Sequence, residues 1–284
     1  MTDRVALLGK PLRRRHSVVM HNAAFAAAGI DAEYVLRELE PDEVAAAVAE
    51  ARRPGWLGLG VTAPYKQVVA ALVDEVEPDA AAIGAVNNVV RTAEGRLTGF
   101  NSDAPGFRAG VELALGRPLE GLDVVVAGAG GAAHAVVFAC LRAGVARVTI
   151  GNRSVAKAAD LAARFREVGP GTVAAVAFGR AFDDAAETAD LAVNATTVGM
   201  IDPGATIHVN VLRPDATVFD LVYVPAETPL LAGARARGLR AANGSEMLIQ
   251  QAAIAFERWT GVGGMAPVMR DAVGPLLADT GARA

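Results

Sequence analysis

Several features that would define a class of protein are scarce or missing from this sequence. Cys140 is the only cysteine in 284 residues, which excludes a disulfide framework and a thiolate metal site and leaves a small core residue as its expected role. No uncharged apolar run reaches the roughly 18 residues that a membrane span requires. The opening residues also lack the apolar segment of a secretion signal. We therefore expect a cytoplasmic globular protein with no membrane partner.

The net charge of the chain is small, and its charged residues form no large cluster of a single sign. The net charge is −4, and the only basic triplet, residues 13–15, is predicted to be a solvated loop. No basic stripe points to a nucleic-acid partner. The four histidines, His16, His21, His134 and His208, lack metal-ligand spacing, so we expect no metal and assign them to loop contacts and helix capping.

What the chain does contain is a regular alternation of strand and helix patterns. Strands are predicted at residues 5–8, 33–39, 56–62, 85–91, 97–100, 124–127, 147–150, 172–177, 191–194 and 217–221. Helices are predicted from a cap at Ser17 to Gly29, and at 41–53, 107–116, 131–143, 154–166, 228–237, 245–260 and 267–277. With 52% hydrophobic residues, the chain can fill one or two cores.

This order predicts an α/β protein of two domains. An N-terminal α/β substrate domain comprises residues 1–105 with 240–284, because the last two helices could return to it. Residues 106–239 form a Rossmann-type, doubly wound domain.

A glycine-rich turn follows the strand at 124–127. Gly128 permits a sharp turn, Gly130 leaves room for a pyrophosphate against the backbone, and Ala133 lets the next helix pack closely on the strand. The helix N-terminus then offers free N–H groups to phosphate. Alone, the pattern fits a dinucleotide site and an empty buried turn equally well.

The end of the next strand favours a dinucleotide, and NADP in particular. An NAD site usually places a carboxylate there, on the ribose 2′-hydroxyl. This chain instead has Asn152, Arg153 and Ser154, with Lys157 one turn later. A guanidinium can hold a 2′-phosphate bidentately, and a lysine adds a point charge. NADP is the predicted cofactor, and NAD is the alternative.

Two polar clusters lie at strand ends in the first hundred residues. One contains Thr62 and Lys66, and the other contains Asn101 and Asp103. Alone, the lysine would be a solvated helix residue and the aspartate a helix cap. Together they offer a proton-transfer pair for an alcohol oxidation, since a lysine with a lowered pKa can take the hydroxyl proton as hydride leaves.

Motifs along nearly the whole chain resemble those of the shikimate dehydrogenase family, which includes shikimate/quinate dehydrogenases. They are Gly9-x-Pro11 with Ser17 and His21-Asn22; Val61-Thr62-x-Pro64-x-Lys66; Gly84-Ala85-Val86-Asn87; Asn101-x-Asp103-x-x-Gly106; Gly128 to Ala133; Asn152-Arg153-Ser154; Asn194-Ala195-Thr196-x-x-Gly199-Met200; Asp220-x-x-Tyr223; and Gly244-x-x-Met247-Leu248-x-x-Gln251.

The resemblance implies a catalytic dyad of Lys66 and Asp103. It implies substrate contacts from Thr62, Asn87, Asp103, Tyr223 and Gln251, and Arg15 and Ser17 occupy the positions of the family's carboxylate clamp and are the candidates for that contact. It implies cofactor contacts from Gly128, Ala129, Gly130, Gly131, Ala132, Ala133, Asn152, Arg153, Ser154, Lys157, Asn194, Ala195, Thr196, Gly244 and Met247.

The chain departs from the family pattern around the expected substrate. The family's carboxylate clamp is usually His-Ser-x-Ser-Pro, and its first serine falls on Arg15 and its proline on Val18. The usual asparagine before Val-Thr is Gly60, and the threonine after Asn87 is Asn88. Arg15 would bind a carboxylate bidentately if it points inward, and otherwise the clamp has lost a hydrogen bond. These changes predict retained hydride chemistry with an altered or relaxed substrate preference.

The predicted function is therefore NADP-dependent, reversible reduction of 3-dehydroshikimate to shikimate, in aromatic amino acid biosynthesis. A quinate, aminoshikimate or other specialised enzyme of the same family, with NADP or NAD, is the nearest alternative. A catalytically idle NADP-binding sensor, or another two-domain enzyme such as a methylene-tetrahydrofolate dehydrogenase, is less favoured because the chain keeps both dyad residues and Gln251. A monomer or a homodimer is expected.

Overall fold

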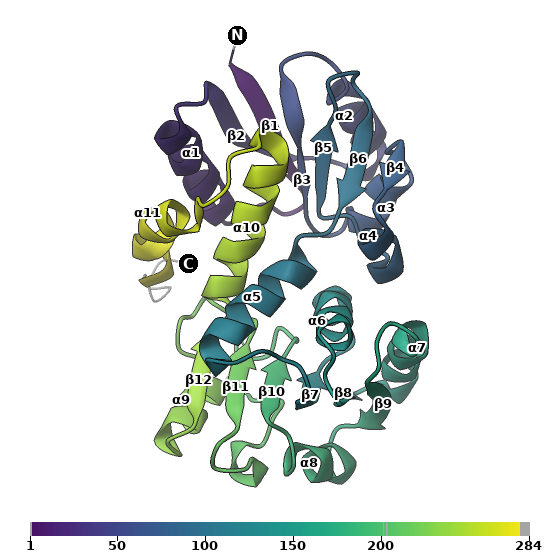
Figure 1. Cartoon of the computed structure of the whole chain (residues 1–284), viewed down its shortest axis with the longest axis vertical. Coiled ribbons are helices and arrows are strands. Elements are labelled where there is room, and N and C mark those ends of the chain that lie inside the picture. Colours follow the sequence, from purple (N-terminus) through teal and green to yellow (C-terminus); the bar gives the residue numbers. More distant parts are fainter. Residues whose placement is uncertain (1, 201, 203, 279–284) are drawn as a thin grey trace. The chain divides into compact units, whose positions relative to one another are not determined.

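The computed structural model describes residues 2–200, 202 and 204–278, and the chain divides into two compact units (Figure 1). The first unit runs to Ser102 and takes up the chain again at Ile249–Leu276, and the second consists mainly of Asp103–Leu248. In the described part, each unit contains one six-stranded sheet. The predicted α/β class is confirmed.

The sheet of the first unit has the strand order β2-β1-β3-β5-β6-β4. Its strands are β1 (Asp3–Gly9), β2 (Ala32–Glu38), β3 (Trp56–Val61), β4 (Glu75–Val76), β5 (Asn88–Arg91) and β6 (Leu97–Phe100). β5 is antiparallel to both of its neighbours, and the other pairs are parallel. The start of β5 therefore lies at the same edge as the ends of β3 and β6, and this edge carries the polar clusters.

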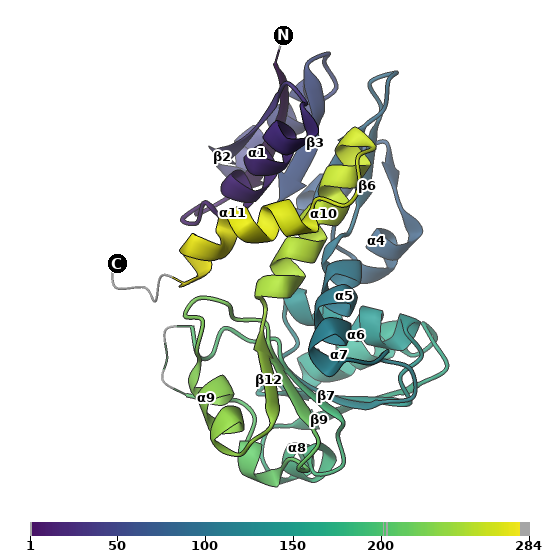
Figure 2. The same cartoon turned by 60° about the vertical axis from the view of Figure 1, so that its left-hand side comes forward.

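Helices cover both faces of this sheet. One face packs against α2 (Val44–Glu50), α3 (Lys66–Ala70) and α4 (Pro78–Ile83), which follow the short 3₁₀ turn η1 (Pro41–Glu43). On the other face, α1 (His16–Ala28) lies beside α10 (Ser245–Thr260) and α11 (Ala266–Ala278) in both views (Figures 1 and 2). Phe25 and Phe256 pack with ring centroids 5.0 Å apart, and the Trp259 indole donates a 2.9 Å hydrogen bond to the Val89 carbonyl. The C-terminal helices do return to the first unit, as predicted.

The second unit is a parallel, doubly wound sheet with the order β12-β11-β10-β7-β8-β9. Its strands are β7 (Asp123–Ala127), β8 (Arg147–Asn152), β9 (Thr172–Ala177), β10 (Leu191–Asn194), β11 (Thr217–Asp220) and β12 (Arg240–Asn243). Its helical elements are α5 (Asp103–Leu115), α6 (Gly131–Arg142), α7 (Val155–Phe165), α8 (Arg180–Ala186), η2 (Val209–Val211) and α9 (Pro229–Ala236). Cys140 is a fully buried core residue of α6, and burial raises the pKa of its thiol to about 12.

Several predicted element boundaries were wrong. Helix α1 begins at His16, so Arg15 is its N-cap residue and Ser17 lies inside the first turn rather than capping it. The predicted helix at 41–53 is a 3₁₀ turn followed by a helix that ends at Glu50, and the strand predicted at 85–91 begins only at Asn88. Strand β12 was not predicted, and because it pairs with β11 it belongs to the second unit. The C-terminal segment that returns to the first unit therefore begins at Ile249 rather than at residue 240.

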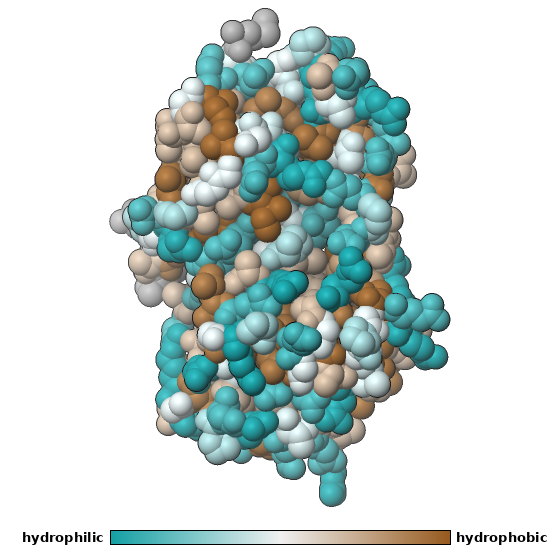
Figure 3. All heavy atoms as spheres, viewed as in Figure 1, coloured by the Kyte–Doolittle hydropathy of each residue, from teal (hydrophilic) through white to brown (hydrophobic). Residues whose placement is uncertain are grey.

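The surface shows no large apolar area on the face seen in Figure 3, where hydrophobic residues are interspersed with hydrophilic ones. The large apolar side chains exposed in the described part are Val68, Leu113, Val155 and Leu276. None of the helices described here combines the length and the apolar character that crossing a membrane requires.

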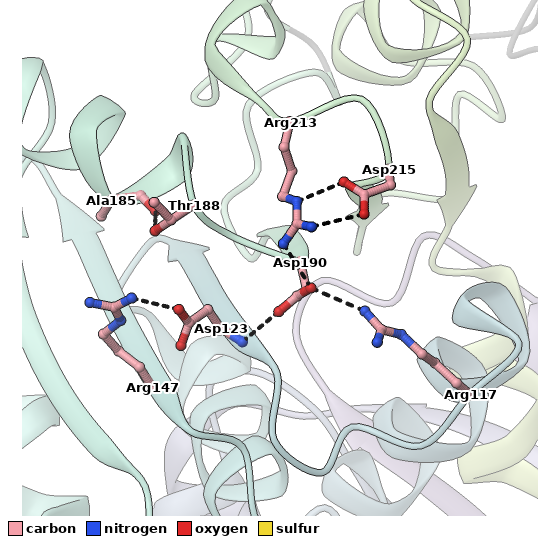
Figure 4. Close-up of polar contacts among 8 residues, drawn as sticks. All are labelled: Arg117, Asp123, Arg147, Ala185, Thr188, Asp190, Arg213 and Asp215. Atoms are coloured by element: carbon pink, nitrogen blue, oxygen red, sulfur yellow. Dashed lines mark hydrogen bonds and ion pairs between the residues drawn. The ribbon is translucent and has the colours of Figure 1, made fainter.

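An ion-pair network lies at the amino edge of the second sheet (Figure 4). Asp190 precedes β10 and accepts bonds from Arg117 (3.1 Å), Arg213 (3.2 Å) and the backbone N–H of Asp123 (2.9 Å). Arg213 also forms a bidentate pair with Asp215. A cavity of about 360 Å³ beside this network lies at the edge opposite the glycine turn, so it is not part of the nucleotide site.

Candidate functional site

The glycine turn lies between β7 and α6, as the sequence predicts. Gly128 has a φ of +110°, and a Cβ there would come within 2.8 Å of Thr196 Cγ2, so both its conformation and its packing require glycine. Gly130 and Gly131 are exposed, and a Cβ on either would meet nothing within 4 Å. No side chain caps α6. An exposed, uncapped helix N-terminus with open space before it is a suitable site for a pyrophosphate.

The cationic turn follows the adjacent strand. β7 and β8 are parallel, with Ala127 opposite Gly151, so Gly128 and Asn152 leave neighbouring strands at the same edge. The Asn152 side chain donates a 3.0 Å bond to the Ser154 carbonyl and holds the turn. Arg153, Ser154 and Lys157 are exposed, as a group that binds a phosphate from solution must be. The structure thus places the predicted phosphate and pyrophosphate residues one strand apart.

The Asn194 side chain is hydrogen-bonded inside the protein. This side chain at the end of β10 is 1% exposed and donates to Asp220 Oδ1 (2.8 Å) and the Val198 carbonyl (3.1 Å). Its oxygen accepts bonds from the side chains of Thr196 (2.7 Å) and Thr206 (3.1 Å). Because both N–H groups are committed inside the protein, Asn194 can shape the loop that Ala195 and Thr196 form but has no donor left for a cofactor.

Asp220 completes this hydrogen-bonded group at the end of β11. It is fully buried and also accepts bonds from the Thr228 hydroxyl (2.7 Å) and the Val222 N–H (3.0 Å). Burial raises the pKa of its carboxyl, and the three hydrogen bonds act in the opposite direction. The Asp220-x-x-Tyr223 motif therefore contains a structural carboxylate, followed by a half-buried Tyr223.

Gly244 and Met247 are constrained by packing within the second unit. A Cβ on Gly244 would lie 2.3 Å from the Leu221 carbonyl oxygen, so only glycine fits after β12. The start of α10 packs closely on α5 at Gly110, because a Cβ on this glycine would lie 2.7 Å from the backbone nitrogen of Met247. Asp103 is the first residue of α5 and is half-buried.

In the first unit, the residues predicted to contact substrate gather at the shared edge of β3, β5 and β6. The Thr62 N–H bonds to the Leu8 carbonyl (2.9 Å), and Lys66 begins α3. The Lys66 carbonyl accepts a 3.0 Å bond from Val86, which places Lys66 beside the segment that leads into Asn87. Thr62 and Lys66 are both half-buried.

Ser102 links Asn87 to Gln251, a role that the sequence did not reveal. Its hydroxyl accepts from Asn87 (3.2 Å) and Asn88 (2.8 Å) and donates to Gln251 Oε1 on α10 (3.2 Å). Asn87 Oδ1 in turn accepts from the Ser102 N–H (2.8 Å) and from Asn88 Nδ2 (2.9 Å). Asn88, one of the departures from the family pattern, is therefore a member of a buried network that orients two predicted substrate residues. Only the position of Ser102 between Asn101 and Asp103 could have suggested it.

Arg15 and Ser17 lie at the start of α1. Arg15 is exposed, and no described residue forms a side-chain hydrogen bond with it. Ser17 is half-buried within the first turn.

The histidines predicted to serve as loop contacts and caps differ from one another. His21 is a buried residue of α1 that stacks on Tyr34 with ring centroids 4.4 Å apart, so its expected role was wrong. His134 lies in α6 and packs edge-on against Phe165. His208 is the N-cap residue of η2 and pairs with Asp183 at 3.1 Å. Within the described ranges, no three His, Cys, Asp or Glu side chains converge as metal ligands would.

Comparison with known proteins agrees with this arrangement. Family models match residues 7–89 (shikimate dehydrogenase substrate binding domain), 112–199 (shikimate / quinate 5-dehydrogenase) and 244–273 (shikimate 5'-dehydrogenase C-terminal domain). The shikimate dehydrogenase (NADP(+)) of Moorella thermoacetica is 41% identical over 281 residues, which cover 96% of this chain and 94% of that protein. The chain belongs to the shikimate dehydrogenase family.

Solved structures of family members share the whole fold. Shikimate 5-dehydrogenase from Thermus thermophilus, in complex with NADP(H) and shikimate, is 36% identical with a TM-score of 0.86, covering 96% of this chain and 99% of that one. Quinate dehydrogenase from Corynebacterium glutamicum, in complex with NAD, is 35% identical with a TM-score of 0.89, and the match covers 96% of this chain and 99% of that one. The family thus includes members with different cyclic hydroxy acids and different cofactors, so the residues of this chain must decide between them.

Proposed function

We propose that this chain is an NADP-dependent dehydrogenase that reversibly reduces 3-dehydroshikimate to shikimate. The observation that carries the proposal is the exposed Arg153 turn, one strand from the open glycine turn, in a chain 41% identical to a shikimate dehydrogenase (NADP(+)). Conversion of this ketone to its alcohol is a step of aromatic amino acid biosynthesis, and we place the enzyme in the cytoplasm as a monomer or homodimer.

The second unit fits the cofactor. The N–H groups at the start of α6, with Gly130 and Gly131, would bind the pyrophosphate. Arg153 and Lys157 would bind the 2′-phosphate, with Ser154 as a further hydrogen-bonding group. Ala195, Thr196 and Met247 would line the nicotinamide side, on the loop that Asn194 holds. When bound, NADPH supplies the hydride that reduces the carbonyl carbon.

Lys66 and Asp103 are the proposed proton-transfer pair. In the direction of reduction, the Lys66 ammonium would donate its proton to the carbonyl oxygen as hydride reaches the carbon, which yields the alcohol. In the reverse direction, the neutral amine would accept the hydroxyl proton. Asp103 would orient the lysine and bind a substrate hydroxyl, and general acid/base catalysis of this kind contributes about 10²–10⁴-fold.

Asn87, Gln251, Thr62 and Tyr223 would bind the hydroxyls and the carboxylate of the substrate, with Ser17 and Arg15 at the carboxylate end. The network around Ser102 supports this for Asn87 and Gln251, because it fixes their orientation before substrate arrives.

The second candidate is oxidation of quinate, aminoshikimate or a related ring acid, with NADP or NAD. It is favoured by three of the positions where the chain departs from the family pattern, Arg15, Gly60 and Asn88. None of these alters Lys66 or Asp103, so the chemistry would be the same.

Initial rates with shikimate, quinate and aminoshikimate, each with NADP⁺ and NAD⁺, test the proposal. We expect shikimate with NADP⁺ to have the highest kcat/KM. Turnover of a relative without turnover of shikimate would favour the second candidate, and no turnover at all would favour a sensor.

The variant Lys66→Ala tests the assigned proton donor. We expect kcat to fall by about 10²–10⁴-fold with little change in NADP⁺ affinity. Unchanged turnover would show that another group transfers the proton.

A further inference from the structure

The hydroxyl of Tyr34 occupies the space that a side chain at position 60 would need. A Cβ on Gly60 would lie 2.4 Å from Tyr34 Oη and 3.5 Å from its Cζ. Tyr34 belongs to β2 and Gly60 to β3, with β1 between them, so the tyrosine ring extends across the middle strand. Gly60 is the position where the family usually has an asparagine.

Tyr34 is held rigidly in this position. Its backbone N–H donates to Asn22 Oδ1 (2.7 Å), and its carbonyl accepts from Asn22 Nδ2 (3.1 Å). Its ring is stacked on His21 and lies 5.9 Å from the Trp259 ring. The residue is 3% exposed, yet no residue in the described ranges forms a hydrogen bond with its hydroxyl. The hydroxyl oxygen is not among the fully buried polar atoms that lack a partner, so it keeps contact with solvent and a ligand can reach it.

The hydroxyl lies on the face of the sheet that carries the proposed substrate residues. Alternate residues of a strand face the same side, so position 60 faces the side on which Thr62 lies. Gly60 is opposite Asn88 in the β3–β5 register, and Asn88 is joined through Ser102 to Gln251.

Tyr34 packs on the face of α1 to which Ser17, at the proposed carboxylate end of the site, belongs. Ser17 and His21 are four residues apart on α1 and therefore share a helix face. The Tyr34 ring stacks on that His21.

We propose that Tyr34 is a specificity-determining residue whose hydroxyl donates a hydrogen bond to the carboxylate of the substrate, in place of a side chain at position 60. The inference rests on the proposed function. Burial raises the pKa of the phenol, so it stays a neutral donor throughout the range in which the enzyme works. A phenol supplies one donor on a rigid ring, which suits one carboxylate oxygen.

The test compares shikimate with its methyl ester, which lacks the negative charge, in the wild-type chain and in Tyr34→Phe. For shikimate we expect KM to rise about 10- to 100-fold with kcat within about twofold, because a hydrogen bond to a charged group is lost. For the ester we expect little change, so the preference for the acid falls about tenfold or more. The KM for NADP⁺ should not change. An equal loss for acid and ester, or no loss, overturns the inference.

Tyr65→Phe is the matched control. Its hydroxyl is also buried, but it donates to the Leu39 carbonyl at 2.6 Å and so already has a partner. We expect it to lower Tm while leaving the ratio between acid and ester unchanged. A change in that ratio as large as in Tyr34→Phe would mean that loss of any buried phenol produces the effect.

A second pair of variants tests the packing without relying on activity. Gly60→Ala places a methyl group on the tyrosine oxygen and should lower Tm by several degrees, whereas in a Tyr34→Phe background it should cost much less. Equal costs in both backgrounds overturn the proposed placement.

The activity measurements also separate failure of the proposed function from failure of this inference. A wild-type chain that oxidises neither acid nor ester overturns both. An active wild type whose preference for the acid is unchanged in Tyr34→Phe overturns the inference alone.

Discussion

Replacement of Arg153 by serine should lower the preference of this enzyme for NADP over NAD. Arg153 follows β8, one strand from the glycine turn, and is exposed with no ion-pair partner among the described residues. Its guanidinium is therefore available to the 2′-phosphate, which NADP has and NAD lacks. Arg153→Ser removes the bidentate contact but leaves Asn152 to hold the turn through the Ser154 carbonyl.

The size of the effect follows from the kind of contact. A hydrogen-bonded contact to a charged group contributes about 1.5–3 kcal/mol, and the exposure of Arg153 favours the lower half of that range. At 1.4 kcal/mol per factor of ten, KM for NADP⁺ should rise about 10- to 40-fold. KM for NAD⁺ should stay within about twofold. Lys157→Ala should give a smaller increase, since a lysine supplies a point charge rather than a planar pair of donors.

The assay is the initial rate of shikimate oxidation at saturating shikimate, with NADP⁺ and NAD⁺ varied separately. Arg142→Ser is the control, because Arg142 is an exposed arginine in the last turn of α6, away from the glycine turn. Arg142→Ser should change neither the KM for NADP⁺ nor the KM for NAD⁺. If Arg153→Ser left KM for NADP⁺ unchanged, or raised both values by the same factor, the 2′-phosphate would not be held by this turn.

Three further outcomes follow from the same structure. Gly130→Ala should leave Tm unchanged, because the new Cβ meets no protein atom, but it should raise KM for NADP⁺. Gly128→Ala should lower Tm, because the φ of this residue is +110° and the new Cβ would meet Thr196. Differential scanning fluorimetry with cofactor titration separates the two variants, and equal losses of Tm would contradict this expectation. Burial lowers the pKa of His21 from 6.5 to about 3, so protonation favours the unfolded chain and stability is lost as the pH falls below about 6.5. Urea unfolding at pH 7 and pH 5 should show a loss about 2 kcal/mol larger for wild type than for His21→Phe, and equal losses would show that His21 is not neutral and buried. Asp190→Ala removes three bonds (Figure 4) and should cost about 1–3 kcal/mol in urea unfolding without changing KM for NADP⁺. Asp215→Ala, whose side chain is 69% exposed, should cost about 0–1 kcal/mol, and a larger cost than for Asp190→Ala would refute the central role of Asp190.

The sequence predicted the elements whose patterns are local. The strands at 172–177 and 191–194 and the helix at 245–260 have the predicted bounds, because β-branched or apolar runs are bounded by turn residues or caps that act on near neighbours. The glycine turn was predicted for the same reason, since its conformation depends on Gly128 itself. The motif resemblance supplied the candidate residues on both units.

Elements that depend on distant partners were missed or misjudged. β12 is a four-residue strand with weak alternation that exists because β11 offers an edge to pair with. The bonds that Asn194 forms with Asp220 and Thr206 were not predicted, because these partners are 26 and 12 positions away in the chain. Ser102 could not be recognised as a hub because its partner Gln251 is 149 residues away.

The sequence by itself determined the α/β class, the glycine turn, the cationic turn that favours NADP, and the family to which the chain belongs. Each of these depends on residue types at short spacing, where backbone conformation and charge act directly. Only the tertiary structure decided how the departures from the family pattern are accommodated. Arg15 is exposed, Asn88 joins the Ser102 network, and the missing side chain of Gly60 leaves its space to Tyr34. That last contact exists because the strand order β2-β1-β3 brings residues 34 and 60 together across a third strand, and no local pattern encodes such an order.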